Sequence, residues 1–453
     1  MAGRHKFSLR NLQAAFAEIF GLGDKVSLVV FFSACLIIVT AVFLFIYSAP
    51  PHTISITSGP EGSFFATNAE KYRKILARNG VKLKILPSNG SLDNLTRLRN
   101  PSFSVDIGFV QGGLASGFGV DNLVSLGSIS YEPLLVFYRG ARPEEVLSQF
   151  TGKRLAIGSA GSGTHSLASA LLAANGIVPG GSTLLSEIDT EEAAQALIDG
   201  KLDAIFLMGD SASPQLIHKL LQTPQIDLFD FNQAEAYVRR FPYLNKLDLP
   251  RGSIDFGKDI PHHDVYLIGP TVEIIARKGL HPALSDLLIE AAQDVHGKAG
   301  LFKQRGEFPA PLEHEYSISD DAVRYYKSGK GFLYRYLPFW MASLLSRVII
   351  VFVPVVVLMI PVLRTIPAVY RWRMRMRIYR WYRVLLSLEK DLMAGIGPEK
   401  REQLLERLDA IEGEVNRMKV PAAFADQFYV LRGHIGFVHD RLVDNTHSHT
   451  PPV

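Results

Sequence analysis

The sequence predicts an α/β fold made of two lobes, and three observations lead to this expectation. Short β-branched strands alternate with amphipathic helices from residue 52 to residue 249, an order that favours a mostly parallel sheet with right-handed crossovers. Polar turns follow the strands at their carboxyl ends, where such sheets bind ligands. The chain then returns through residues 263–296, so two crossings would join two lobes around a cleft that can close over a small ligand.

Composition narrows the classes of function. With 453 residues, 47% of them apolar, the chain can form a sizeable core and two or three domains. A formal charge of +4 does not indicate a general nucleic-acid-binding surface, so we expect no nucleic acid partner. The single cysteine, Cys35, leaves no disulfide framework and no cysteine-based metal site. We expect neither a metal nor a cofactor.

In the first lobe, periodicity predicts three strands with two helices between them. The strands are expected at residues 52–58, 81–86 and 105–110, and the helices at 64–79 and 92–99. A polar turn follows each strand: Ser58 to Ser63, then Asn89-Gly90-Ser91, then Gln111. We therefore expect these turns to lie together at one edge of the sheet.

A second unit begins near Gly152 with a strand, a glycine-rich turn and a helix. Residues 155–157 form the strand, Gly158 to Gly163 the turn, and Thr164 to Ala174 the helix. Such a turn directs several backbone N–H groups to one place, with the positive end of the helix dipole behind them, which suits an anion. The alternative, that Ser162 or Thr164 only caps the helix, stays open. The turn lacks the ending of a Walker loop and the spacing of a nucleophile elbow.

The second unit continues with the same order of elements. We expect strands at residues 184–188 and 204–208 and a helix at 190–199 capped by Thr190. Asp210 follows the last of these strands and either holds a ligand amine or forms a turn. The crossings between lobes are expected near Val136–Arg139 and Ser253–Val265, which assigns about 50–139 and 253–339 to lobe 1 and about 140–252 to lobe 2.

Two apolar segments flank this domain of residues 50–339. After a basic leader at residues 1–25, residues 26–48 are long enough to span a bilayer as an uncleaved anchor, although a signal peptide passes a similar test. Residues 342–363 form a second candidate span, with a buried soluble helix as the alternative. Arginines are dense in residues 364–383, as expected on a cytoplasmic flank beside anionic lipids. We therefore expect both termini in the cytoplasm and the domain outside.

The tail, residues 364–453, carries two apolar stripes at helical spacing within residues 399–443. This pattern predicts a hairpin of two helices. The hairpin either packs against the end of the juxtamembrane helix or docks to a cytoplasmic protein partner.

The soluble part resembles the TAXI solute-binding proteins of TRAP transporters. The residues that carry the resemblance are ITSGPEGSFFATNAEKYRKIL, ILPSNGSLDNLTRLRN, DIGFVQGG, KRLAIGSAGSGTHSLASALL, DGKLDAIFL and FPAPLEHEYSISDDAVRYYKSGKG, in the family's order. The resemblance implies a two-lobe periplasmic binding protein fold (type II, Venus flytrap) that closes over a small organic acid or amino acid without catalysis. Ordinary members have a cleaved signal and end near residue 331; this chain continues into a span and a helical tail.

From the turns and the resemblance we expect a cleft for a small anionic solute. Its predicted ligand-binding residues are Ser58, Gly59, Gly62, Ser63, Phe64, Asn89, Gly90, Ser91, Gln111, Gly158, Ser159, Gly161, Ser162, Gly163, Thr164 and Asp210. The expected role is delivery of the solute to a separate membrane permease at the inner membrane. The alternative is a sensor that signals through its spans to the tail. No serine–histidine–acid triad can be assembled by spacing, so we expect no enzyme.

Overall fold

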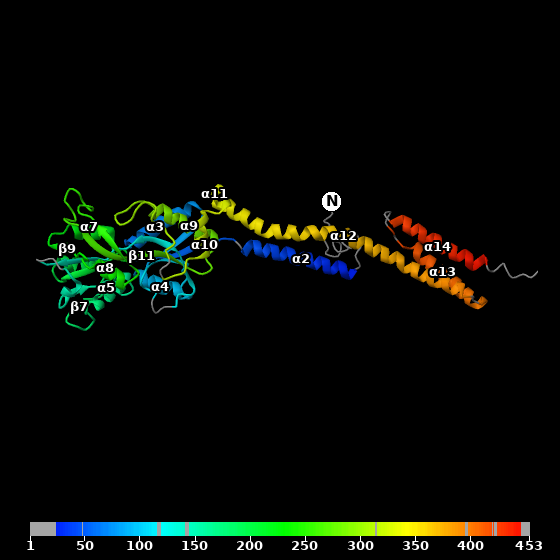
Figure 1. Cartoon of the computed structure of the whole chain (residues 1–453), viewed down its shortest axis with the longest axis horizontal. Coiled ribbons are helices and arrows are strands. Elements are labelled where there is room, and N and C mark those ends of the chain that lie inside the picture. The colour runs from blue at the N-terminus through cyan, green and yellow to red at the C-terminus, as the bar shows by residue number, and fades with distance from the viewer. Residues whose placement is uncertain are drawn as a thin grey trace, which may run out of the picture. The chain divides into compact units, whose positions relative to one another are not determined.

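The computed structural model describes residues 24–47, 49–115, 119–140, 145–312, 315–394, 397–418, 420 and 424–444. The chain divides into two compact units, Ser48–Arg347 and the remainder, Met1–Tyr47 with Val348–Val453 (Figure 1). The predicted leader lies almost wholly outside the described residues.

The unit Ser48–Arg347 contains two sheets. The first has the order β10-β11-β3-β1-β2, with β4 paired to β11. Its strands are β1 (Thr53–Thr57), β2 (Lys82–Leu86), β3 (Ile107–Gln111), β4 (Leu123–Tyr131), β10 (Leu244–Leu249) and β11 (Val265–Arg277). β1 is parallel to β2 and β3, whereas β11 is antiparallel to β3, β4 and β10. Ile56, Phe109 and Ile274 lie in the core beneath it.

Four helices pack beside this sheet with an apolar stripe at helical spacing. They are α3 (Phe64–Arg78), α4 (Ser91–Arg99), α9 (Pro282–His296) and α10 (Asp320–Ser328); the short α11 (Phe332–Tyr336) follows them and buries none of its residues. α3 buries Phe65, Ala69, Tyr72 and Leu76, and its N-cap Ser63 accepts a hydrogen bond from the amide of Ala66. The expected helices at 64–79 and 92–99 are therefore confirmed within one residue at each end.

The second sheet has the order β7-β6-β8-β5-β9. Its strands are β5 (Leu135–Arg139), β6 (Arg154–Ala156), β7 (Leu184–Ser186), β8 (Ala204–Leu207) and β9 (Ile226–Leu228). The 3-10 helix η1 (Leu147–Phe150) and helices α5 (Gly163–Ala174), α6 (Thr190–Ile198), α7 (Pro214–Leu221) and α8 (Ala234–Arg240) accompany it. The core includes Phe137, Leu171 and Phe206.

Three expectations need correction: the direction of the strands, the positions of the crossings and the N-cap of α6. Both sheets are mixed rather than mostly parallel, because β11 pairs antiparallel with β3, β4 and β10 in the first sheet and β5 pairs antiparallel with β8 and β9 in the second. β5 enters the second sheet directly from β4, without the crossover helix that would make it parallel. The chain thus crosses between the sheets at residues 132–134 and again between β9 and β10, earlier than expected each time. The N-cap of α6 is Asp189 rather than Thr190, since the Asp189 side chain accepts from the amide of Glu191.

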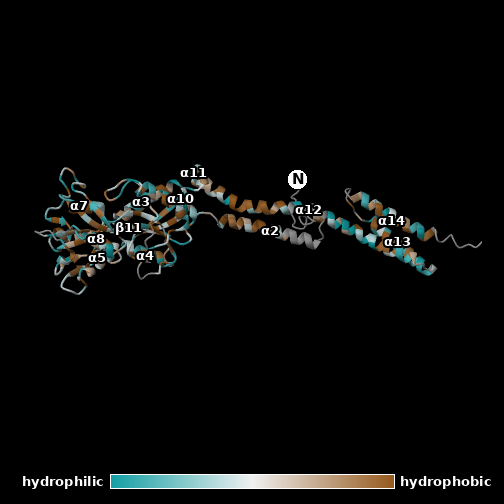
Figure 2. Cartoon of the chain, in the orientation of Figure 1, coloured by the Kyte–Doolittle hydropathy of each residue, from teal (hydrophilic) through white to brown (hydrophobic). Residues whose placement is uncertain are grey.

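The other unit is helical in its described residues. α2 spans Asp24–Tyr47 and α12 spans Phe339–Met393. Within the described ranges, one helical stretch is long and apolar enough to cross a membrane, the 21 residues Met341–Pro361; Cys35–Tyr47 is a shorter apolar stretch. Figure 2 shows the apolar colouring of this part of α12 and the more polar colouring further along the helix. The span predicted at 342–363 has the required length and composition, and the first span stays a prediction.

The tail contains α13 (Pro398–Asn416) and α14 (Ala425–Asp444). Leu385 and Leu388 of α12, Leu408 of α13 and Leu431 and Val438 of α14 belong to one buried cluster. The hairpin therefore packs against the end of α12, as one of the two alternatives predicted. Docking of a cytoplasmic partner stays a prediction.

Candidate functional site

The carboxylate of Asp210 lies at the meeting point of the two lobes and is fully buried. Its Oδ2 accepts hydrogen bonds from the backbone amides of Gly163, at 2.5 Å, and Ser91, at 3.2 Å. Its Oδ1 accepts from the hydroxyls of Thr164, at 2.9 Å, and Ser211, at 3.0 Å. We call these five residues the Asp210 cluster. The cluster satisfies an ionised carboxylate with four donors.

Two helix N-termini from opposite lobes converge on this carboxylate. Gly163 begins α5, whose N-cap Ser162 accepts from the amide of His165, and Ser91 begins α4. Free N–H groups and the helix dipole make such ends good anion sites. The glycine-rich turn therefore caps α5 through Ser162 and also donates a hydrogen bond to an anion through the amide of Gly163. That anion is the carboxylate of Asp210.

Burial and hydrogen bonding act in opposite directions on Asp210. Burial raises the pKa of the carboxyl, and the hydrogen bonds from Gly163, Thr164, Ser91 and Ser211 lower it. Since two of the donors are backbone amides that cannot accept a proton in return, they favour the ionised form.

Further hydrogen bonds join the lobes around the cluster. The amide of Asp93 donates to the carbonyl of Gly161, at 2.9 Å, and Gln111 Nε2 donates to the carbonyl of Gly163, at 3.0 Å. The amide of Phe64 donates to the carbonyl of Gly209, at 3.1 Å. The structure is thus a closed form in which loops of both lobes touch directly.

Two glycines permit this close approach. Gly90 has a φ of +127°, and a Cβ there would collide with Asp210 Oδ2. A Cβ at Gly163 would overlap the Gln111 side-chain amide. A side chain at either position would push the two lobes apart.

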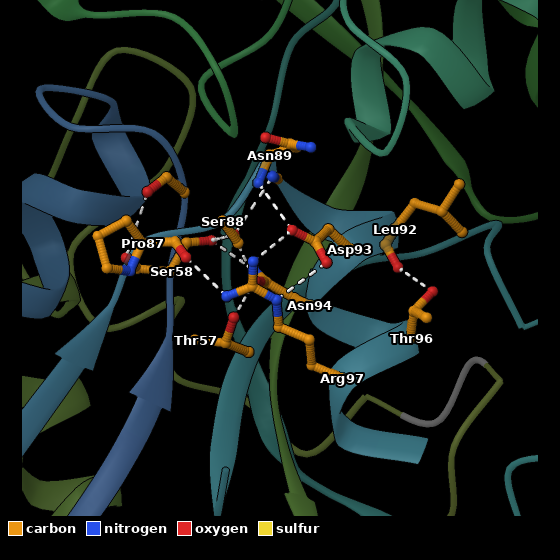
Figure 3. Close-up of polar contacts among 12 residues, drawn as sticks. Thr57, Ser58, Pro87, Ser88, Asn89, Leu92, Asp93, Asn94, Thr96 and Arg97 are labelled. Atoms are coloured by element: carbon orange, nitrogen blue, oxygen red, sulfur yellow. Dashed lines mark hydrogen bonds and ion pairs between the residues drawn. The ribbon is translucent and has the colours of Figure 1, made fainter. Parts of the chain in front are cut away.

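Asn94 forms hydrogen bonds with the ends of the first lobe's strands (Figure 3). Its Oδ1 accepts from the hydroxyls of Thr57, at 2.6 Å, and Ser88, at 2.7 Å. Its Nδ2 donates to the carbonyls of Ser58 and Phe109. One buried amide therefore ties together the ends of β1, β2 and β3, from which the polar turns project.

The structure brings most of the predicted site residues together. Gly59, Gly90, Ser91, Gln111, Ser162, Gly163 and Thr164 approach Asp210 or one another across the lobes, and Asn89 lies next to Gly161. Ser63 caps α3, Ser58 is buried against Ser88, and Gly158 and Ser159 shape the turn before α5. Gly62 is in an exposed turn with open space around it, and Phe64 is 37% exposed.

The ligand-binding role of Asp210 stays a prediction, and the structure adds three buried polar residues to the site, Ser211, Asn94 and Glu132. All the donors to Asp210 are internal, so in this closed form it does not offer its carboxylate to a ligand amine. The three added residues were not predicted. The Asp93–Asn94 pair within SNGSLDN and the Tyr131-Glu132-Pro133 turn were the available signals, and nothing in their spacing marks them as buried.

A pocket of about 470 Å³ lies beside the Asp210 cluster and is lined from both lobes. We call it the interlobe pocket; its walls include Phe64, Phe65, Glu132, Leu135, Ile217 and His296. A larger hollow of about 670 Å³ lies along β9 and the residues 258–263 and contains none of the predicted site residues. The interlobe pocket is therefore the better candidate for a ligand.

Comparison with known proteins finds only distant similarities to this chain. Solved structures that resemble it include an ancestral arginine-binding protein bound to arginine (12% identity, TM-score 0.36, covering 54% of this chain and 92% of that chain). Another is the periplasmic aliphatic sulphonate binding protein from Escherichia coli (13% identity, TM-score 0.36, 55% of this chain and 69% of that chain). No curated protein matches the chain. Residues 63–265, less than half of the chain, match the NMT1-like family.

Proposed function

We propose that this protein is a membrane-attached, two-lobe receptor that captures a small solute between its lobes outside the cytoplasmic membrane. The observation that carries the proposal is the convergence of α4 and α5, from opposite lobes, on the Asp210 carboxylate. Contacts of this kind hold two lobes closed, and the interlobe pocket beside them offers the enclosed volume.

A small organic acid or amino acid is one candidate solute, and the proposed sites are the turns that surround Asp210. Its carboxylate would take the place of the Asp210 carboxylate at the two helix ends, because both present the same chemistry to the same donors. Binding of the solute at the two helix ends requires that its carboxylate displace the carboxylate of Asp210. A solute in the interlobe pocket needs no such exchange.

The proposed role is delivery of the solute to a separate permease of the TRAP type, without catalysis. The TAXI-like order of motifs from residue 56 to residue 331 supports this role. The span at Met341–Pro361 supports attachment to the membrane. The basic residues that follow it, with Arg371, Arg375 and Arg377 exposed, support a cytoplasmic tail.

A sensor is the second candidate, and α12 favours it. This single helix begins with Phe339 and runs through the apolar stretch to Met393, where its last turns share a core with α13 and α14. A continuous helix can transmit a displacement between its two ends. Purification of the full chain from native membranes separates the roles: a permease among the bound proteins supports delivery, and a soluble cytoplasmic protein supports sensing.

The test of solute capture is a thermal-shift screen of the full chain in detergent against small acids, amino acids, sulfonates and amines. A solute that binds the folded state raises the melting temperature by mass action. Gly163→Asp would prevent closure and should abolish the shift. Gly413→Asp, at a helical glycine of the tail with open space around it, is the matched control and should retain it. A screen without any hit on well-folded protein contradicts solute capture.

A further inference from the structure

The interlobe pocket contains an acid that the Asp210 cluster does not use. Glu132 lies where the chain crosses from β4 to β5 and is 4% exposed. Among the described residues, neither of its carboxyl oxygens has a hydrogen-bond partner of normal geometry. A Cβ at Gly209 would lie 3.1 Å from Glu132 Oε1, so the carboxyl reaches the end of β8 in the second lobe.

A buried carboxyl without partners is costly, and something normally satisfies it. Burial raises the pKa of Glu132, the neighbouring Asp210 carboxylate raises it further, and the Asp210 backbone amide lowers it in part. Asp210 already accepts four internal hydrogen bonds. Of these two acids, Glu132 is therefore the one with acceptor capacity left for a ligand.

The rest of the pocket suits an apolar body. Phe65, Leu135 and Ile217 line it from both lobes. His296 also lines it, is 4% exposed, and burial lowers its pKa to about 3, so the imidazole is neutral at neutral pH.

Two lysines line the same pocket, and each is engaged elsewhere. Lys71 Nζ donates to Asn68 Oδ1 at 3.1 Å, and Lys303 Nζ donates to the carbonyl of His296 at 2.7 Å. Neither pairs with Glu132, so the acid remains available to a cationic group that enters the pocket.

We propose that the interlobe pocket binds a small organic ammonium, with an apolar body against Phe65 and Ile217 and its N–H donors on Glu132. An ammonium group offers up to three donors, and its positive charge favours the ionised form of the carboxyl, which opposes the effect of burial on the pKa of Glu132. Two acceptor oxygens in an apolar enclosure match this chemistry. The inference rests on the proposed capture between the lobes and names the class of solute.

The test is calorimetric titration of the full chain in detergent with three probes that share one ring. The probes are phenethylammonium chloride, phenethyl alcohol and sodium phenylacetate. We expect the ammonium to bind about tenfold or more tightly than the alcohol, as a hydrogen bond to a charged group allows. Glu132→Gln keeps the shape and should remove this preference. Glu61→Gln, in an exposed turn, should keep it.

A second variant tests whether a loss of ammonium binding in Glu132→Gln reflects misfolding rather than the missing carboxylate. Ile217→Phe narrows the pocket without changing Glu132 and should weaken the ammonium at least tenfold in protein whose melting transition is intact. If the alcohol or the acid binds as tightly as the ammonium, or Glu132→Gln leaves the preference unchanged, the ammonium assignment is wrong and capture between the lobes still stands. If none of the probes binds, the assignment also fails, and the wider solute screen alone then decides on capture.

Discussion

The backbone amide of Ser91 and the carboxylate of Asp210 are 119 positions apart in the chain and form a hydrogen bond of 3.2 Å across the two lobes. In a two-lobe receptor this is where a bound anion would bridge the helix ends. Here the bridge is a side chain of the protein itself. Closure therefore has an internal contribution, and an external acid at the proposed site would compete with it.

Removal of the Asp210 carboxylate should destabilise the closed form and create a site that an external acid can fill. In Asp210→Ala the donors at Gly163, Ser91, Thr164 and Ser211 lose their buried acceptor, a cost of about 3 kcal/mol. Formate or acetate should then raise the melting temperature of the variant by mass action and leave the wild type almost unchanged. Thermal shift of the full chain in detergent is the measurement.

Asp227→Ala is the control for this rescue, because Asp227 is exposed. It should neither lower the melting temperature appreciably nor respond to acetate. Chloride at the same ionic strength separates a general salt effect from occupation of the site. Equal responses to acetate and chloride in Asp210→Ala would mean that the helix ends do not bind an external carboxylate.

Gly90→Ala should be more harmful than Gly62→Ala. Gly90 and Gly62 both have positive φ, +127° and +82°, so alanine strains the backbone at each. Only at Gly90 does the new Cβ collide with Asp210; at Gly62 nothing lies within 4 Å. We expect Gly90→Ala to lose about 1–3 kcal/mol more than Gly62→Ala, as overpacking of a buried site does. Urea unfolding of both variants measures the difference, and equal losses would contradict direct contact between the lobes.

The sequence was sufficient to predict the helices and strands, but not to predict that the anion at the ends of α4 and α5 is the Asp210 carboxylate. The spacing of apolar residues predicted α3 and β1, and the glycine-rich turn predicted the N-terminus of α5, because these signals are local in the sequence. That Asp210 fills the site depends on a contact with Ser91 that only the tertiary fold creates. The antiparallel pairing of β5 was missed for a similar reason, since periodicity carries no information on strand direction.

The basic segment after Pro361 should lie in the cytoplasm and the two-lobe unit outside. Alkaline phosphatase, which is active only outside the cytoplasm, should be active when fused after Gly329, at the end of α10, and inactive when fused after Asp444. Replacing Arg371, Arg373, Arg375 and Arg377 together by glutamine should weaken this orientation, because arginines beside a span hold it on the cytoplasmic side. Activity of both fusions would contradict a span at Met341–Pro361.

Stability should fall as pH rises from 4.5 to about 7 because of Glu273, which lies in β11 and is 1% exposed. Burial raises the pKa of Glu273 from 4.5 to about 7, the Ser125 hydroxyl opposes this in part, and Glu315 adds to it. Between these two values the folded protein holds a proton that the unfolded chain releases. The free energy of unfolding therefore decreases with pH across this interval, by about 3 kcal/mol in total. Glu273→Gln should remove this loss, so its melting temperature should exceed that of the wild type near pH 8 and not near pH 5.

Other buried acids such as Glu132 are present in both proteins, so their effect cancels in the difference between the two melting temperatures. Glu235→Gln, at an exposed position, is the control and should show no gain near pH 8. A constant difference between Glu273→Gln and the wild type across this range would mean that Glu273 does not take up the proton.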